Sequence, residues 1–521
     1  MTSQLVEKDL SAAGERKPQF ALKLAIFLAL VKLTVHIFFN WLAPHLGYGF
    51  FRDELYFIVC GRRLAWGYVD QAPMVALQAR ICEVVFGTSL VAFRMLSAFA
   101  GCLTIILTGL LTWAMGGTRL AQGISMTVVL LWPFYLGFDG YLSMNSFEPV
   151  FWMTFVLSII LMANGADRRL WLLAGLAFGL GLENKQDILF FAAAVVVGMC
   201  LSGQQYLLWN RWAAIALIVA VLLGLPNVLW QMNNHWPTWQ FLHNPARPII
   251  HHHILGFIRQ QLFLLNVTLL FAGAGMLWLL FRHRNGIFRF VAFGYLVFFV
   301  VMFLLHARTY YLAPYYPVLI GAGSIALVDW TQWNRWMLKV ALCVVLAYDL
   351  AYAPTAIPMM RPAPYLAYRN RLLRLTNPGA GLQSDDLEQW YSDRIGWNTV
   401  VADVVGVYRD LPPADRSKTA LLSHFYGDAS AIDVLGQQYG LPQAISGSQN
   451  FWLWGPQDYD GSSVIAVGYL RSEIPPVFQS VTQVGFIRQR FATAYEARPI
   501  FLCKGMSPPL QQYWPKLKRW M

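Results

Sequence analysis

The sequence predicts an all-α polytopic membrane domain of about eleven spans, followed by a soluble α/β domain. Three observations lead to this fold class. Hydrophobic residues make up 57% of the 521 residues and charged residues only 13%, with a mean hydropathy of +0.46, whereas soluble domains hold roughly 25% charged residues. Apolar runs of about 20 residues, the length that crosses a bilayer, recur between residues 21 and 354. The remaining stretch, 355–521, is polar and begins with a proline-rich segment.

The first predicted span is an N-terminal anchor. Residues 1–20 are expected to form a cytoplasmic tail, and the next run lacks an Ala-x-Ala cleavage signal, so we expect it to be retained. Lys32 interrupts this run, where an ammonium is costly unless it is paired or faces water. It is therefore either a buried partner or a side chain that snorkels to the interface. The apolar runs begin near Leu22, Ser89, Leu120, Pro149, Leu170, Ile188, Ala213, Ile254, Ile287, Leu312 and Trp336.

The distribution of charge predicts how these spans are oriented. Loops rich in Lys and Arg lie on the cytoplasmic side, and the even-numbered loops carry such anchors at Arg119, Arg168, Arg169, Arg211, Arg282, Arg284, Arg289, Arg335 and Lys339. The odd-numbered loops carry Asp53, Glu54, Asp70, Asp139, Asn145, Glu148, Glu183, Asn184, Lys185, Asp187, Asn233, Asn234, His235, His306 and Arg308. The functional site is thus predicted to lie on the outer face of the membrane. The alternative for any single group is that it lies at a helix end because hydrocarbon excludes charge.

The first outer loop, residues 43–73, contains a mixed apolar and basic pattern that predicts a helix lying in the interface. Asp53 and Glu54 are adjacent, so on a helix they point about 100° apart and are expected to have different roles, one as a base and the other as an organiser. Asp70 precedes Pro73 and a predicted helix from Met74 to Gly87. Asp70 is either a second functional acid or a helix cap.

The later outer loops add polar groups beside span ends. Glu148, at the start of a predicted span, is either part of the functional site or is favoured at that position by the helix dipole. Lys185 departs from the Lys/Arg rule, and with Arg308 at another outer end it could neutralise a phosphate. The loop from residue 231 to 253 ends in His251, His252 and His253, but consecutive residues on a helix diverge, so we predict an interfacial segment and no metal site.

Four segments resemble glycosyltransferase family 39: RDELYFIVCGRRLAWGYVDQAP, LENKQDILFF, LPNVLWQ followed by HWPT, and YYLAPYYPVLIGAG. The resemblance covers roughly residues 20–355 and, more loosely, YSDRIGW and FWLWGP. It implies a GT-C type fold and an enzyme that transfers a hexosyl or pentosyl group from a polyprenyl (undecaprenyl) phosphate. The implied acceptor is an envelope component such as lipopolysaccharide or lipid A, a glycan or a protein. The implied place is the cell inner membrane, with the C-terminal domain outside.

The resemblance also suggests residue roles. Catalytic roles fall on Asp53, the usual candidate for the base, and on Glu54 and Asp70. Relatives often have His-Pro-Pro after the second acid, where this chain has Gln71, Ala72 and Pro73. The donor phosphate is assigned by similarity and placement to Asn184, Lys185 and Arg308, and the other substrate contacts to Asn145, Glu148, His235, Tyr310 and Tyr311. The sequence does not require a divalent cation and leaves the use of a cofactor open.

Such a reaction needs a base on one side of the anomeric carbon and positive charge at the leaving phosphate on the other. A single displacement would invert the anomeric configuration. Two alternatives remain. A transporter would also have many spans, but it usually shows inverted repeats, and no convincing repeat is found. A non-catalytic envelope assembly protein is the second.

The polar C-terminal part predicts a small α/β domain. Strand-like runs occur at 420–425, 464–470 and 499–503, and helical patterns at 398–410 and 428–439, the second closed by Gly440. The six cysteines occur singly, without a CxxC motif, which argues against a zinc site or a disulfide framework. The formal charge of +12 is expected to meet anionic lipid headgroups rather than nucleic acid, because Lys and Arg cluster in short loops.

Overall fold

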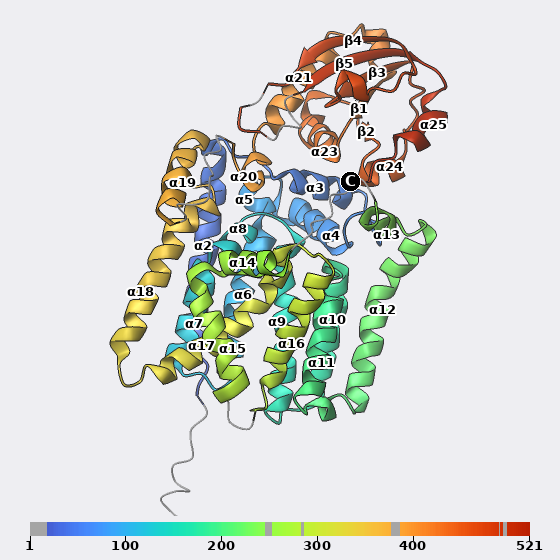
Figure 1. The fold of residues 1–521 in the computed structure, drawn as a ribbon. Helices are drawn as coiled ribbons and strands as arrows, with labels where there is room; N and C mark the ends of the chain where they lie inside the picture. The colour runs from blue at the N-terminus through green and yellow to red at the C-terminus, as the bar shows by residue number, and fades with distance from the viewer. Residues whose placement is uncertain are drawn as a thin grey trace, which may run out of the picture.

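A computed structural model shows a helical bundle with a smaller α/β domain on one end (Figure 1). The structure describes residues 18–244, 253–282, 286–376, 386–488, 490–492 and 498–520. Most of the predicted cytoplasmic tail, His251, His252 and Arg284 lie outside these residues. The predicted fold class, a polytopic helical domain with a C-terminal α/β domain, is confirmed.

Seven helical segments in the described residues are long and apolar enough to cross a bilayer. They are Leu22–Leu46 (α2 and η1), Met95–Ala114 (α6), Met144–Ala163 (α9), Arg211–Asn233 (α12), Ile254–Phe281 (containing α14, Ile254–Leu265, and α15, Leu269–Leu277), Thr309–Trp330 (η7, Thr309–Tyr315, and α17, Tyr316–Trp330) and Arg335–Thr355 (α18 and η8). Four shorter apolar helices are Arg119–Leu131 (α7), Leu170–Asn184 (α10), Ile188–Leu201 (α11) and Arg289–Leu304 (α16). Together these helices account for the predicted apolar runs.

Some predicted boundaries are wrong. The second run was expected from Ser89, but Ser89 caps a separate short helix, α5 (Leu90–Phe93), before α6 begins. The fourth was expected from Pro149, which instead lies inside α9. Pro149 is the sixth residue of α9, so it removes one intrahelical donor, a loss that membrane helices tolerate where neighbouring groups satisfy the freed carbonyl.

Helices of the bundle approach closely where small residues face one another. A side chain on Gly323 would collide with the carbonyl of Phe271, and one on Gly275 with that of Leu319, so α15 and α17 can pack only with glycine at both places. Elsewhere long apolar faces stay exposed: Leu217 and Leu222 on α12 are about 60% exposed. Such a surface suits lipid rather than water.

Lys32 forms a buried ion pair with Asp139, at 2.9 Å between Nζ and Oδ2, and also donates to the carbonyl of Tyr135. Both charged side chains are essentially inaccessible, at 0% and 1% exposure. Lys32 is therefore a buried partner, and the snorkelling alternative is wrong. Asp139, predicted to lie in an outer loop with functional groups, is occupied by this pair.

Two short helices, α3 (Arg52–Arg62) and α4 (Met74–Ile81), lie between the bundle and the α/β domain (Figure 1). The interfacial interpretation of α3 fails in one respect. Leu55, Tyr56 and Ile58 are fully buried rather than open to lipid, because residues of the C-terminal domain pack over the helix in one apolar cluster. The predicted helix from Met74 is α4 followed by a π-helical turn, Cys82–Phe86.

The C-terminal domain begins with α19 (Pro362–Thr376), α20 (Gln389–Ser392) and α21 (Trp397–Arg409). Its five-stranded sheet has the order β2-β1-β3-β5-β4, with β1 (Thr419–Ser423) parallel to β2 (Ala444–Ser446) and β3 (Ser463–Val467). Strand β5 (Pro499–Met506) runs antiparallel to β3 and to β4 (Phe478–Phe486). The predicted strands correspond to β1, β3 and β5, and the predicted helices to α21 and to α23 (Tyr426–Leu435) with the 3₁₀ turn Gln437–Tyr439. Strands β2 and β4 were not predicted.

Candidate active site

Asp53 lies in the first turn of α3, where it faces the C-terminal domain. Its side chain is 35% exposed. The hydroxyl of Tyr426, from α23, donates to Asp53 Oδ1 at 2.7 Å, and Arg52 Nε lies 3.5 Å from the same oxygen. Arg52 also contacts Asp393 at 3.3 Å. Asp53 is thus an accessible carboxylate that residues of both domains hold in place.

Glu54, its neighbour, has a different environment. It is fully buried, and Arg94 donates to both of its oxygens, at 2.8 Å from Nε and 2.6 Å from Nη2. The backbone N–H groups of Phe51 and Leu142 donate to it as well, each at 2.8 Å. Both carboxylate oxygens of Glu54 are therefore occupied by hydrogen bonds from the protein. The predicted division of roles therefore places the organiser at Glu54, which ties the first outer loop to α6 and to the segment before α9.

Asp70 belongs to the same neighbourhood as Asp53. Tyr56 on α3 donates to Asp70 Oδ1 at 3.1 Å, and the Tyr56 ring lies 4.8 Å from the ring of Tyr426. Burial raises the pKa of Tyr426, and Arg52 opposes this rise, while Asp53 and Asp70 add to it. The two predicted acids thus flank one pair of tyrosines.

Lys185 is surrounded by anionic groups. Its ammonium lies 3.0 Å from Glu148 and 2.7 Å from Asp187, and it donates to Asn145 Oδ1 at 3.2 Å. The ring of Tyr311 covers it at 4.0 Å. Two carboxylates compensate one cation, so this geometry does not favour Lys185 as a direct phosphate ligand, and that role stays a prediction. Asn145, Glu148 and Tyr311, predicted as substrate contacts, all contact Lys185, and their role toward a substrate stays a prediction.

Asn184 and Arg308 complete the predicted phosphate set. Asn184 is buried, and its amide donates to the carbonyl of Met144 at 2.9 Å, which fixes the start of α9. Arg308, before η7, is exposed and forms no ion pair with a carboxylate among the described residues. It lies within electrostatic reach of Tyr310. Among Asn184, Lys185 and Arg308, only Arg308 has an exposed positive charge that a ligand could reach.

A layer of aromatic rings connects the Asp53 and Lys185 groups. Phe138 lies 5.9 Å from Tyr141 and 5.8 Å from Tyr310, ring centroid to ring centroid, and Lys185 lies 5.4 Å from the Tyr310 centroid. Burial raises the pKa of Tyr141, which also senses the charges of Arg394 and Asp53. The structure therefore brings Asp53 and Lys185 to the same end of the bundle.

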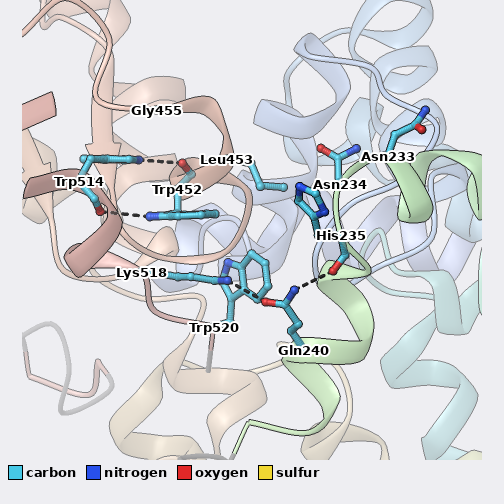
Figure 2. Close-up of a pocket in the computed structure, with 10 residues that line it drawn as sticks. All are labelled: Asn233, Asn234, His235, Gln240, Trp452, Leu453, Gly455, Trp514, Lys518 and Trp520. Carbon is cyan, nitrogen blue, oxygen red and sulfur yellow. Dashed lines mark hydrogen bonds between the residues drawn. The ribbon is translucent and has the colours of Figure 1, made fainter. Parts of the chain in front are cut away.

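His235 lines a separate cavity of about 450 Å³ between the end of α12 and the C-terminal tail (Figure 2). Trp452, Trp514 and Trp520 form one wall, and Lys518 donates to Gln240 at 2.8 Å. His235 is thus not placed with Asp53 or Lys185. The cavity is nevertheless linked to the Asp53 group, because Asn450, two residues before Trp452, donates to the hydroxyl of Tyr56 at 2.7 Å.

Sequence reasoning missed the contributions of the C-terminal domain to this site. Tyr426 reaches Asp53 and Asn450 reaches Tyr56 across 373 and 394 residues of sequence. No local pattern predicts such long-range contacts. The loosely similar segments YSDRIGW, which contains Asp393 and Arg394, and FWLWGP, which follows Asn450, were the hints in the sequence. Within the residues that the structure describes, no group of three or more His, Cys, Asp or Glu side chains is arranged to hold a metal ion.

Comparison with known proteins agrees with the geometry. Residues 70–230 match the family model described as dolichyl-phosphate-mannose-protein mannosyltransferase. The chain is 27% identical over 193 residues to undecaprenyl phosphate-alpha-4-amino-4-deoxy-L-arabinose arabinosyl transferase 1 of Sodalis glossinidius (strain morsitans), a match covering 36% of this chain and 31% of the relative. The matched part is thus about a third of that relative's length.

Solved structures extend the likeness over nearly the whole chain. ArnT from Cupriavidus metallidurans bound to undecaprenyl phosphate aligns with a TM-score of 0.58 and 13% identity, covering 94% of this chain and 99% of ArnT. ArnT in the apo state gives a TM-score of 0.55 and 14% identity, covering 93% and 98%. The fold that the resemblance implied is thereby confirmed: the chain has the GT-C fold that ArnT shows.

Proposed function

We propose that this protein is an integral membrane glycosyltransferase that transfers a sugar from a polyprenyl phosphate, undecaprenyl phosphate in a bacterial membrane, to an acceptor in the cell envelope. The GT-C fold and the matched mannosyltransferase model support a lipid-linked donor. The observation that carries the proposal is Asp53: an accessible carboxylate at the end of the bundle, held by both domains beside a second acid, Asp70.

In the proposed reaction, Asp53 accepts the proton of an acceptor hydroxyl or amine. The freed oxygen or nitrogen forms a bond to the anomeric carbon, and the bond from that carbon to the phosphate oxygen breaks. The electron pair of the broken bond stays on the leaving polyprenyl phosphate. Tyr426 occupies Oδ1 of Asp53, which leaves Oδ2 to take the proton. A single displacement of this kind inverts the configuration at the anomeric carbon.

The leaving phosphate requires positive charge where water is scarce. Arg308 fits this need, because its guanidinium is exposed and has no carboxylate partner in the described part of the chain. Lys185 and Asn184 are proposed to support the phosphate site indirectly. Lys185 fixes Glu148 and Asn145 under the rings of Tyr310 and Tyr311, and Asn184 fixes the start of α9.

The lipid donor also constrains where the chemistry takes place. Its prenyl chain stays in the bilayer, so the sugar phosphate lies at headgroup depth, at the ends of the spans. Asp53 and Lys185 lie at the end of the bundle that carries the α/β domain, while α12 begins at Arg211 at the opposite, basic end (Figure 1). By the Lys/Arg rule we place the α/β domain outside the inner membrane.

The cavity beside His235 is proposed to hold the acceptor (Figure 2). Trp452 and Trp520 add apolar surface for the C–H groups of a sugar, and amides of the lining add hydrogen bonds. Lys518 lies over both rings, 4.8 and 3.6 Å from their centroids, and adds one positive charge. This lining suits a glycan or glycolipid with an anionic group. The hydrogen bond from Asn450 to Tyr56, which in turn contacts Asp70, connects the cavity to the acidic groups and supports this proposal.

The function can be tested in a strain that lacks the gene. The strain is complemented with wild type, Asp53→Asn or a control, Asp410→Asn, which alters an exposed carboxylate of the soluble domain. Mass spectrometry of the envelope glycolipids is expected to show one sugar-modified species restored by wild type and the control and absent with Asp53→Asn. If Asp53→Asn restores the full profile, a non-catalytic assembly role is the better account.

A further inference from the structure

Arg394, at the junction of α20 and α21, is a buried guanidinium without a hydrogen-bonded partner. The residue is 2% exposed. Its Nε is enclosed and unpaired, and no guanidinium nitrogen donates a hydrogen bond within the described residues. The guanidinium carbon lies 5.2 Å from the ring centroid of Tyr141. Burying an uncompensated cation is costly, so its retention needs a reason.

The carboxylates around Arg394 are already engaged. Glu54 is taken by Arg94 at 2.6 Å, and Asp393 lies 3.3 Å from Arg52. Arg94 adds a second positive charge to the neighbourhood. Burial and Arg94 lower the pKa of Arg394, and Glu54, Tyr391 and Tyr141 oppose this fall only in part. The described surroundings therefore supply no anion of their own that pairs with this guanidinium.

A second unpaired donor lies in the same place. Tyr48, in the first outer loop, is 1% exposed, and its hydroxyl has no hydrogen-bond partner among the described residues. Burial raises the pKa of Tyr48, the charge of Arg394 opposes that rise, and Glu388 adds to it. Glu388 is itself engaged by Tyr365 at 3.1 Å and Arg369 at 3.3 Å, so it does not pair with Tyr48. Two buried donors that share a neighbourhood and lack an acceptor indicate a site for acceptor oxygens.

The position of this pair matches the needs of the reaction. The backbone N–H of Gly49 donates to the Arg394 carbonyl at 2.6 Å, so the first outer loop is bound directly to the C-terminal domain here. Tyr141 lies under Arg394, and its ring lies 4.8 Å from the ring of Phe51, two residues before Asp53. Arg394 is therefore close to the start of the helix that carries Asp53, which would place a cation and a base near one bound substrate.

We propose that Arg394 and Tyr48 bind the phosphate of the polyprenyl carrier. This inference rests on the proposed function and deepens it, because it adds residues of the C-terminal domain and the first outer loop to the phosphate site for which Arg308 was proposed. A guanidinium binds phosphate oxygens through paired hydrogen bonds, and the tyrosine hydroxyl adds a third. Lys185, in contrast, already has two carboxylate partners. The site is then incomplete without the α/β domain.

Binding of undecaprenyl phosphate to the full-length protein in nanodiscs tests the proposal. Arg394→Gln is expected to weaken binding by about tenfold or more, the scale of hydrogen bonds to a charged group, and Tyr48→Phe by a smaller factor. Arg409→Gln, at an exposed arginine on α21, is the matched control and should bind as wild type does. Undecaprenol, which lacks the phosphate, should bind wild type and Arg394→Gln equally.

Several outcomes would overturn the proposal. One is unchanged carrier binding in both Arg394→Gln and Tyr48→Phe. Another is an equal loss for undecaprenol, which would show a purely structural effect. A third is Arg394-dependent binding of inorganic phosphate with unchanged carrier binding, which would assign the site to a free anion. Because Arg394→Gln could misfold, Tyr48→Phe and Arg394→Lys are measured beside it, and thermal unfolding is recorded for each.

The same experiment separates this inference from the proposed function. Asp53→Asn should keep carrier binding while losing sugar transfer. If wild type neither binds the carrier nor transfers sugar, the proposed function fails. If wild type does both, and Arg394→Gln and Tyr48→Phe do so equally well, only the assignment of the phosphate site fails.

Discussion

Replacing Glu54 by Gln should destabilise the protein, whereas replacing Asp53 by Asn should not. Glu54 is fully buried and accepts from Arg94 at 2.8 and 2.6 Å and from the Phe51 and Leu142 backbone at 2.8 Å. Glu54→Gln leaves Arg94 as a buried charge without compensation, a change that typically costs about 3–5 kcal/mol. Asp53 is 35% exposed, and an exposed substitution usually stays within roughly 0.5 kcal/mol.

Thermal unfolding of the purified protein in detergent, run beside the transfer assay, separates the two carboxylates. We expect a clear fall in the unfolding midpoint for Glu54→Gln and an unchanged midpoint with lost activity for Asp53→Asn. Glu54→Gln combined with Arg94→Met removes both charges and should recover a substantial part of the lost stability, because no unpaired charge is left. A Glu54→Gln protein that is fully stable yet inactive would refute the organiser role and make Glu54 part of the chemistry.

Three further predictions concern other parts of the molecule. Lys32→Met alone should destabilise by about 3–5 kcal/mol because it strands Asp139, and Asp139→Asn in addition should restore much of this in thermal unfolding. Burial raises the pKa of Asp428 to about 7, although the charges of Arg498 and Arg52 oppose the rise. The folded state therefore binds this proton more tightly than the unfolded state does. The contribution of Asp428 to the free energy of unfolding should fall as pH rises from about 4 to about 7. Asp428→Asn should accordingly gain stability over wild type at pH 8 but not at pH 4, and an equal gain at both would contradict this. Lys518→Gln should raise the KM for acceptor without changing carrier binding, unlike the exposed control Lys418→Gln, and an unaltered KM would count against the acceptor cavity.

The membrane domain could be predicted from the sequence because its signal is local. Apolar length alone locates the helices, and the alternation of basic and acidic loops brings Asp53 and Lys185 to one end. Asp53 and Glu54 also have different surroundings as expected, because they are neighbours on the helix α3 and their side chains diverge. The ends of the helices were predicted less accurately, since Pro149 lies inside α9 instead of starting it.

The site itself could be predicted only in part, because its remaining contacts are long-range. Tyr426 and Arg394 come from a domain whose docking onto α3 leaves no periodic trace in sequence. The burial of α3 has the same cause, since its apolar face meets that domain rather than lipid. The ion pairs of Lys185 could be predicted in part, because Asp187 lies two residues away and Glu148 was expected on the same face of the membrane. The sequence does not give the distances from the Lys185 ammonium to these two carboxylates.

In the proposed reaction, Asp53 is the general base for sugar transfer from a polyprenyl phosphate. The most direct measurement is the rate at which purified protein in proteoliposomes converts an undecaprenyl-phosphate sugar to free undecaprenyl phosphate and glycosylated acceptor. Loss of a general base typically costs about 10²- to 10⁴-fold, so we predict a fall of that size for Asp53→Asn with carrier binding intact. An Asp53→Asn protein that turns over at the wild-type rate would contradict the account.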